Sequence, residues 1–297
     1  MQFNPLTIAY VKRLQPYLHS HPFRSCDLTT GGLFLWADAF HYRYAIEHDT
    51  LFISGVAVND TTLPIYSLPL GRLPLSDSLE ILHEHSISTG CHKMVLSSVP
   101  EEALPVLIDA GAREVEQLAD WSDYIYEADK LSTFAGKKLS KKRNHLNRFA
   151  ADHPDATFRA INADTDSDAL IDFYEHLSTT HDSPMALYDR HMTLWALRHL
   201  KEFPFEGALL STPENGIVAF TLGEAVADTL HVHIEKMNHE INGAGETICR
   251  DFTEMMLSRH PGLRWVNRQD DSGDMGLRRA KLALHPCSLL HKYNVVF

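Results

Sequence analysis

The chain has 297 residues and a formal charge of −12 at neutral pH, with 27 Lys and Arg against 39 Asp and Glu. A hydrophobic fraction of 44% and a charged fraction of 22% are typical of a globular protein, and they exclude a disordered, collagen-like or coiled-coil chain. No apolar run of about 18 or more residues occurs, so we expect no membrane-spanning segment. The N-terminus lacks a basic region followed by an apolar run, so we expect no secretory signal. The four cysteines form no Cys-x-x-Cys pair, which predicts reduced thiols and a cytoplasmic location.

In chain order, the first half is predicted to alternate short strands and helices. A helix is expected after Pro5, strands at 32–36, 42–46, 51–56 and 63–68, a helix at 76–89 with Ser76 as its N-cap, a strand at 93–97, a helix at 101–110 and a strand at 124–127.

The second half has a clearer order. A strand is expected at 157–161, helices at 166–179 and 189–202, strands at 207–211, 216–222 and 229–236, a helix at 245–259, a strand at 264–267, a helix at 275–284 and a strand at 289–296. This is the order of the acyltransferase fold called GNAT, and the first half follows it more loosely.

The element order therefore predicts an α/β protein (α+β mixed sheet) with two tandem GNAT-like acyltransferase domains. We expect an N-terminal domain at 1–135, a basic connecting helix at 136–152 and a C-terminal domain at 153–297. A single mixed α/β domain with a coincidental order is the alternative.

The junction is basic. Between Lys130 and Ala151 the chain carries seven Lys or Arg and no Asp or Glu. On a helix, Lys137, Lys141 and Arg148 lie opposite an apolar stripe, and such a face suits the phosphates of a tRNA, a cofactor or a lipid head group. A solvated helix whose cations pair with neighbouring acids is the alternative. The negative chain and the lack of interleaved aromatic residues disfavour DNA as a partner.

Several stretches resemble a known family. These are 123–126, 136–138, 142–149, 266–273, 276–281, His285-Pro286 and Lys292-Tyr293, and they resemble an uncharacterised bacterial family grouped with the C-terminal domain of phosphatidylglycerol lysyltransferase. The resemblance implies tandem GNAT-like domains, similar to those of lysyltransferases and Fem-type aminoacyl transferases, but it supplies no substrate. Gln269 stands where the family pattern has Glu, and Ala283-Leu284 stands where it has Ser-Tyr.

One loop is a candidate phosphate anchor. Glu240-Ile-Asn-Gly243-Ala-Gly245 matches the GNAT pyrophosphate pattern apart from Glu240. Gly243 and Gly245 would let a phosphate approach the N–H groups at a helix start, with Lys137, Lys141 and Arg148 as further cofactor-binding candidates. Because Glu240 and Glu246 place negative charge there, a plain helix start is the alternative. The glycines favour acyl-CoA as the donor, whereas the basic helix favours aminoacyl-tRNA.

The strand at 229–236 carries the candidate catalytic residues. With a period of two, His231, His233 and Glu235 share one face of the strand. Burying three polar side chains costs free energy unless that face borders a water-filled cleft. A histidine would act as general base and Glu235 would orient it or bind an amine. Buried, hydrogen-bonded histidines are one alternative. A metal site is another, but other His-x-His pairs occur in this His-rich chain, and we expect no metal.

The C-terminal block is the candidate substrate-binding site. Asn267, Arg268 and Asp271 lie at the end of a predicted strand, where sites of α/β proteins gather. Arg278 and Lys281 share one face of the following helix. Together they could hold a carboxylate, a phosphate or an aminoacyl ammonium. An ion-paired corner between the strand and the helix is the alternative.

These patterns predict an acyl- or aminoacyl-transferase that acts on an amine or hydroxyl of a small-molecule acceptor. The donor would be aminoacyl-tRNA or acyl-CoA, so tRNA is a candidate partner. A non-catalytic ligand-binding protein with a degenerate GNAT fold is one alternative. A nucleic-acid-binding module that uses the basic helix at 137–148 is another.

Overall fold

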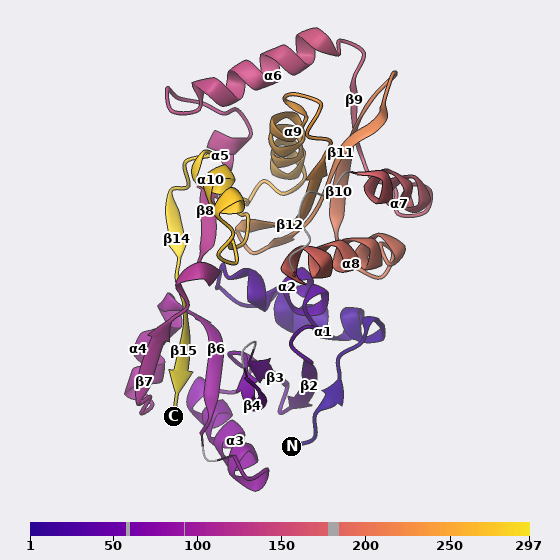
Figure 1. Ribbon diagram of the computed structural model, residues 1–297. Coiled ribbons are helices and arrows are strands. Elements are labelled where there is room, and N and C mark those ends of the chain that lie inside the picture. Colours follow the sequence, from indigo (N-terminus) through magenta and orange to yellow (C-terminus); the bar gives the residue numbers. More distant parts are fainter. Residues whose placement is uncertain (58–59, 92, 178–183) are drawn as a thin grey trace. The chain divides into compact units, whose positions relative to one another are not determined.

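The structure, a computed structural model, describes residues 1–57, 60–91, 93–177 and 184–297. The chain divides into two compact units, each built on a β-sheet of its own (Figure 1). Unit 1 contains Met1–Asp123, Asp270–Asp274 and Leu289–Phe297, and unit 2 contains Tyr124–Gln269 and Met275–Ser288. The predicted mixed α/β class is confirmed.

Unit 1 is organised around a mixed sheet whose described strands follow the order β1-β2-β3-β4-β6-β15-β7, with β5 beside β3. The strands are β1 (Asn4–Pro5), β2 (Arg43–Glu47), β3 (Thr50–Ala57), β4 (Asp60–Tyr66), β5 (Leu70–Gly71), β6 (Val95–Pro100), β7 (Glu114–Gln117) and β15 (Lys292–Val296). The helices are α1 (Val11–Leu18), α2 (Thr30–Leu35), α3 (Leu75–Ser88) and α4 (Leu104–Asp109). In Figure 1 the yellow β15 lies between β6 and β7, so the last strand of the chain completes this sheet.

Unit 2 has a second sheet, whose described strands follow the order β14-β8-β13-β12-β11-β10-β9. The strands are β8 (Asp123–Glu127), β9 (Thr157–Ala160), β10 (Glu206–Thr212), β11 (Gly216–Val226), β12 (Thr229–Met237), β13 (Trp265–Asn267) and β14 (Ser288–Leu290). The helices are α5 (Ala128–Leu131), α6 (Ser140–Asp152), α7 (Ser167–His176), α8 (Pro184–Arg198), α9 (Ala244–Arg259) and α10 (Met275–Leu282). Among the described residues, no helix combines the length and apolar character needed to cross a membrane.

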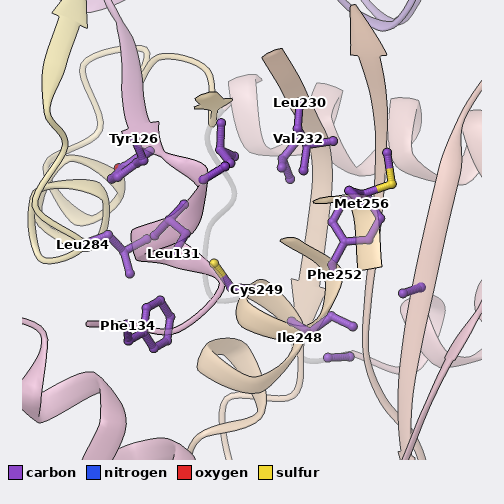
Figure 2. Close-up of a cluster of buried hydrophobic side chains, with 14 of the residues drawn as sticks. Tyr126, Leu131, Phe134, Leu230, Val232, Ile248, Cys249, Phe252, Met256 and Leu284 are labelled. Carbon is purple, nitrogen blue, oxygen red and sulfur yellow. The ribbon is translucent and has the colours of Figure 1, made fainter. Parts of the chain in front are cut away.

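The core of unit 2 lies between its sheet and α9. Leu230 and Val232 of β12 pack in one buried cluster with Phe252 and Met256 of α9 (Figure 2). Aromatic side chains of α7 contact Phe220 of β11 edge-on. Ala219 of β11 belongs to the cluster with α9, whereas the next residue, Phe220, contacts α7, so the two helices cover opposite faces of the sheet.

The two units do not follow the expected domain boundaries, because each unit contains segments from both expected domains. The strand expected to close the first domain is β8, which pairs with β13 in unit 2. The strand expected at 289–296 divides into β14, which belongs to the second sheet, and β15, which belongs to the first. The expected connecting helix corresponds to α6, which belongs to unit 2. Strand pairing satisfies backbone N–H and C=O groups in either sheet, so periodicity along the chain does not decide which sheet receives a strand.

Some expected elements differ. The run at 32–36, predicted as a strand, lies largely in α2, every residue of which is buried. Thr29 caps this helix by accepting a hydrogen bond from the Gly32 N–H at 3.0 Å, and a Cβ at Gly32 would lie 1.8 Å from the Cys26 carbonyl oxygen. The N-cap of α3 is Pro74 rather than Ser76. The expected helix end at Thr179 lies outside the described residues.

Candidate functional site

Two neighbouring strands of unit 2 part beside α9. β12 and β13 are parallel and pair only over Thr229–His231 and Trp265–Asn267, after which β12 continues to Met237 paired with β11 only. A cavity of about 1450 Å³ opens at this point. Its lining includes Glu235, Cys249, Arg268 and Lys281, all of which belong to unit 2.

A β-bulge divides the polar residues of β12 between two faces of the sheet. On β11, Leu222 lies opposite Ile234 and Gly223 opposite Val232, which leaves His233 as the extra residue. A bulge of this kind reverses the alternation of side chains beyond it. Glu235 therefore faces α9, as Leu230 and Val232 do, and the strict alternation expected for this strand does not hold.

The two histidines lie in the interior of unit 2. His233 Nε2 is 2.9 Å from Glu224 Oε1, and its Nδ1 is 2.9 Å from Gln269 Nε2. The His231 ring stacks on that of His233 with centroids 6.3 Å apart. Both side chains are fully buried, and in the described part of the chain neither lines the cavity.

Glu235 forms a two-point ion pair with Arg268. Arg268 Nη2 lies 2.6 Å from Glu235 Oε1, and Nη1 lies 3.1 Å from Oε2. Burial disfavours the charged guanidinium, but the Glu235 carboxylate outweighs it and raises the pKa of Arg268. Burial raises the pKa of the neighbouring Cys249 thiol to about 12, so Cys249 is neutral and accepts a contact from Arg268 Nη1 at 3.0 Å.

Lys281 of α10 is a third charged residue that lines the cavity beside Glu235 and Arg268. Its Nζ donates to the Arg268 carbonyl oxygen at 2.6 Å and lies 5.7 Å from the ring centroid of Tyr124. Tyr126 holds the helix by donating its hydroxyl to the Lys281 carbonyl oxygen at 2.8 Å, and burial raises the pKa of Tyr126. Leu284 and Phe134 add an apolar surface to the same cavity.

The remaining residues of the C-terminal block lie elsewhere. Asn267 is buried and its Oδ1 accepts from the Gln269 N–H at 2.7 Å. Arg278 is on α10 but is not among the lining residues of the described chain. Asp271 belongs to unit 1, where its Oδ1 accepts from the Gly273 N–H at 3.0 Å. Of the five predicted substrate-binding residues, the cavity brings together Arg268 and Lys281.

The glycine-rich loop lies against α6. Gly243 has φ 87°, and a Cβ there would lie 2.4 Å from the His145 carbonyl oxygen. His145 Nδ1 and Asn242 Oδ1 are 2.6 Å apart, and Lys142 Nζ pairs with Glu246 Oε1 at 2.9 Å. Gly243 and Gly245 both line the cavity, but the packing of α6 accounts for Gly243 without a ligand.

The three cations of the predicted basic face are exposed, but Lys137 precedes α6, so only Lys141 and Arg148 lie on the helix. Lys137 and Lys141 are exposed and form no ion pair with the described residues. Arg148 is also exposed and its Nε lies 3.3 Å from Asp152 Oδ2, one helical turn away. Two cations are thus available to an external anion, and the third is held only by a surface pair.

Gly243→Ala should destabilise unit 2. The change forces a left-handed backbone on a residue with a Cβ and drives that atom against α6, which should cost about 1–3 kcal/mol. Gly262→Ala is the matched control, because Gly262 has open space around it. Urea denaturation measures both variants. Equal midpoints for the two would show that α6 does not pack on Gly243.

Sequence reasoning missed a buried charge cluster in unit 1. Lys292 Nζ lies 2.5 Å from Asp27, 2.7 Å from Asp123 and 3.7 Å from Asp270, and it is fully buried. Cys26 Sγ is 3.4 Å from the same nitrogen. Cys26, Asp123 and Asp270 are close enough to share a metal ion, but the Lys292 ammonium already supplies the cation at their centre. The available signal was a lysine within the strand predicted at 289–296.

The family model described as "Phosphatidylglycerol lysyltransferase, C-terminal" matches residues 20–296. A curated, uncharacterised protein of Mycoplasmoides gallisepticum is 26% identical over 177 residues, which are 59% of this chain and 56% of that relative, so the match spans little more than half the relative's length.

Two solved structures are similar over nearly the whole chain. A conserved protein of unknown function from Bacteroides thetaiotaomicron is 26% identical with a TM-score of 0.90, and the match covers 100% of this chain and 99% of the other. The C-terminal domain of a putative lysylphosphatidylglycerol synthetase from Agrobacterium fabrum is 14% identical with a TM-score of 0.67, covering 98% and 92%. These likenesses confirm the family resemblance and the GNAT-like fold predicted from the sequence.

Proposed function

The chain belongs to the phosphatidylglycerol lysyltransferase C-terminal family, and we propose that its unit 2 transfers an aminoacyl group to an amine or hydroxyl of a small acceptor. The observation that carries this proposal is the Glu235–Arg268 pair, which lies in an open cavity where two strands part. The Glu235 side chain is 9% exposed and the Arg268 side chain 15% exposed, so the two do not form an ordinary surface ion pair. Its position beside a cavity suits a reaction in which charge develops and a proton moves.

Arg268 and Lys281 would stabilise the oxyanion. Attack on an aminoacyl ester places negative charge on the carbonyl oxygen, and cations held in a partly dry site stabilise that charge strongly. Arg268 is fixed by Glu235 and Cys249, and Lys281 by the Arg268 carbonyl oxygen. Both cations are thus ordered before a substrate arrives, which avoids reorganisation during the reaction.

Glu235 would take the proton of the attacking group. A carboxylate offers about four lone-pair directions, and Arg268 uses two of them. The other directions leave Glu235 able to accept a proton from the attacking hydroxyl or ammonium, and to return it to the ribose oxygen of the tRNA, which leaves as the ester bond breaks. His231 and His233 take no part in this step, since both are buried and neither lines the cavity of the described chain.

The cavity has room for two reactants. Typical small-molecule sites occupy about 300–1,000 Å³, whereas this cavity measures about 1450 Å³. On one side it is walled by α6, α9 and α10, through Lys142, Cys249 and Lys281. On the other it reaches α7 and α8, through Tyr174 and Arg190. A donor end and an acceptor could therefore meet at Glu235.

The donor that we propose is aminoacyl-tRNA. Lys137, Lys141 and Arg148 lie on the segment that also supplies Lys142 and His145 to the cavity lining, so a polyanion held there would reach the cavity. For acyl-CoA, the proposed phosphate anchor is the Gly243–Gly245 loop, but α6 packs closely on it and Glu246 pairs with Lys142. The arrangement of α6 thus favours tRNA over coenzyme A.

A transfer assay tests the proposal. The purified protein would be mixed with total bacterial tRNA charged with labelled amino acids, and with pooled polar metabolites or extracted lipids as acceptors. We expect loss of label from tRNA with matching gain in an acceptor fraction, and a large loss of this activity in Glu235→Gln. Transfer from acetyl-CoA instead would reassign the donor. Binding of tRNA without transfer would contradict the enzymatic proposal.

The basic face should set the salt dependence of tRNA binding. Replacing Lys137, Lys141 and Arg148 by Gln removes three candidate phosphate contacts, and each lost contact should lower the slope of log affinity against log salt by about one unit. Lys12, Arg13 and Arg113, which are exposed cations of unit 1, replaced by Gln form the charge-matched control. Filter binding across a salt series measures both. Equal slopes in the two triple variants would refute the assignment.

A further inference from the structure

A chain of hydrogen bonds crosses three neighbouring strands of unit 2 on the face opposite Glu235. It joins Glu224 of β11, His233 of β12 and Gln269, which follows β13. Glu224 and His233 are 1% and 0% exposed at their side chains. The transfer mechanism above gives none of these three residues a contact with substrate.

The contacts fix the tautomer of His233. The Gln269 amide donates its Nε2–H to Nδ1, so Nδ1 carries no proton. The ring proton is then on Nε2 and is donated to the Glu224 carboxylate. Both ring nitrogens are engaged, so this imidazole links β11 to the segment that follows β13.

Gln269 keeps a side chain where the backbone favours glycine. Its φ is 60°, in the left-handed region. Its N–H donates to Asn267 Oδ1 at 2.7 Å, and its carbonyl oxygen accepts from the Tyr124 N–H at 3.1 Å. A glycine would make the same main-chain bonds with less strain. The amide contact with His233 is what only the side chain supplies.

We propose that Glu224, His233 and Gln269 are positioning residues that hold the Arg268 guanidinium in the cavity. Gln269 and Arg268 are successive residues at the point where β13 leaves β12, and they extend to opposite faces of the sheet. The hydrogen bond from the Gln269 amide to His233 fixes the peptide bond between Arg268 and Gln269. This fixed backbone directs the Arg268 side chain toward Glu235. The geometric claim stands alone, whereas its catalytic consequence rests on the proposed function.

Gln269→Gly is the discriminating variant. It deletes the amide and relieves the left-handed strain, so the unfolding midpoint should not fall. Ala227→Gly is the matched control, because Ala227 has φ 52° in the turn between β11 and β12 and takes no part in these contacts. Glu224→Gln, which keeps the side-chain volume, gives a second reading if Gln269→Gly does not fold.

Nitrogen-15 NMR of labelled histidine and arginine provides the readout without any substrate. In the wild type, we expect His233 to show a proton on Nε2 and none on Nδ1, and the buried Nε–H of Arg268 to exchange slowly with water. In Gln269→Gly, the His233 signals should shift toward a tautomer mixture, and the Arg268 exchange rate should rise on the order of tenfold. In Ala227→Gly, neither signal should change.

Measurement of the transfer rate is the second test of the positioning role. If transfer is detected, Gln269→Gly should lower kcat about tenfold to a hundredfold with an unchanged KM for the donor. A proton on Nδ1 of His233, or unchanged Arg268 exchange in both Gln269→Gly and Glu224→Gln, would overturn the positioning role. A wild type without transfer from any donor would overturn the proposed function only, because the NMR signals still decide the geometry.

Discussion

Replacing Lys292 by Met should destabilise unit 1 by about 3–5 kcal/mol. The ammonium is fully buried between Asp27 and Asp123, and its removal leaves their carboxylates without the cation that offsets their loss of hydration. Urea denaturation gives the free energy of unfolding. Lys93→Met is the matched control, since Lys93 and Glu114 form an exposed pair at 3.8 Å that should contribute about 0–1 kcal/mol.

The pH dependence of this deficit has a definite sign. Burial alone would raise the pKa of Asp27, but Lys292 lowers it below its usual value. In the wild type this contribution is present above the ordinary carboxyl pKa of about 4 and is lost as the pH falls. Without Lys292, burial should raise the pKa of the Asp27 carboxyl, so the deficit of Lys292→Met should shrink on acidification toward about pH 4. A deficit that grows on acidification would contradict the ion-cluster account.

The double variant Lys292→Met, Asp123→Asn separates charge from packing. Asn keeps the size of Asp123 and removes one of the uncompensated charges, so it should recover part of the lost stability. Destabilisations that simply add would show that the two side chains do not interact energetically.

The hydrophobic pattern identified most helices and strands, because most of them are amphipathic and bury one face in the core of their unit. The segment at 32–36 failed because it is buried on all sides, and a short apolar run then gives no period that separates helix from strand. The signal for a helix was the Thr29 cap together with Gly32, whose missing side chain lets the Cys26 carbonyl approach.

The site was predicted in part. Glu235, Arg268 and Lys281 were candidates from their positions on a strand, at a strand end and on the next helix, and all three line the cavity. The placement of His231 and His233 was not found, because one extra residue in β12 reverses the alternation and nothing in the local sequence marks a bulge. The cluster at Lys292 depends on segments far apart in the chain, and a single sequence does not show that Cys26, Asp123 and Lys292 meet.

Arg268→Met should lower the rate of transfer by about 10²–10³, the usual loss when one oxyanion donor is removed. Glu235→Gln should lower it by about 10²–10⁴, as expected for a general base. Each single variant also leaves a mostly buried charge without its partner, and this should cost stability. Loss of activity in either single variant therefore does not separate catalysis from folding.

The double variant Glu235→Gln, Arg268→Met makes that separation. Both charges are gone, so the free energy of unfolding should return toward that of the wild type, while transfer should remain as low as in the worse single variant. The matched control is Glu206→Gln, Arg259→Met, because this pair at 2.8 Å also belongs to unit 2 and neither residue lines the cavity of the described chain. It should keep full turnover. Recovery of both stability and turnover in the Glu235 and Arg268 double variant would mean that the pair only supports the fold, and the chemistry would then have to lie with other residues of the cavity.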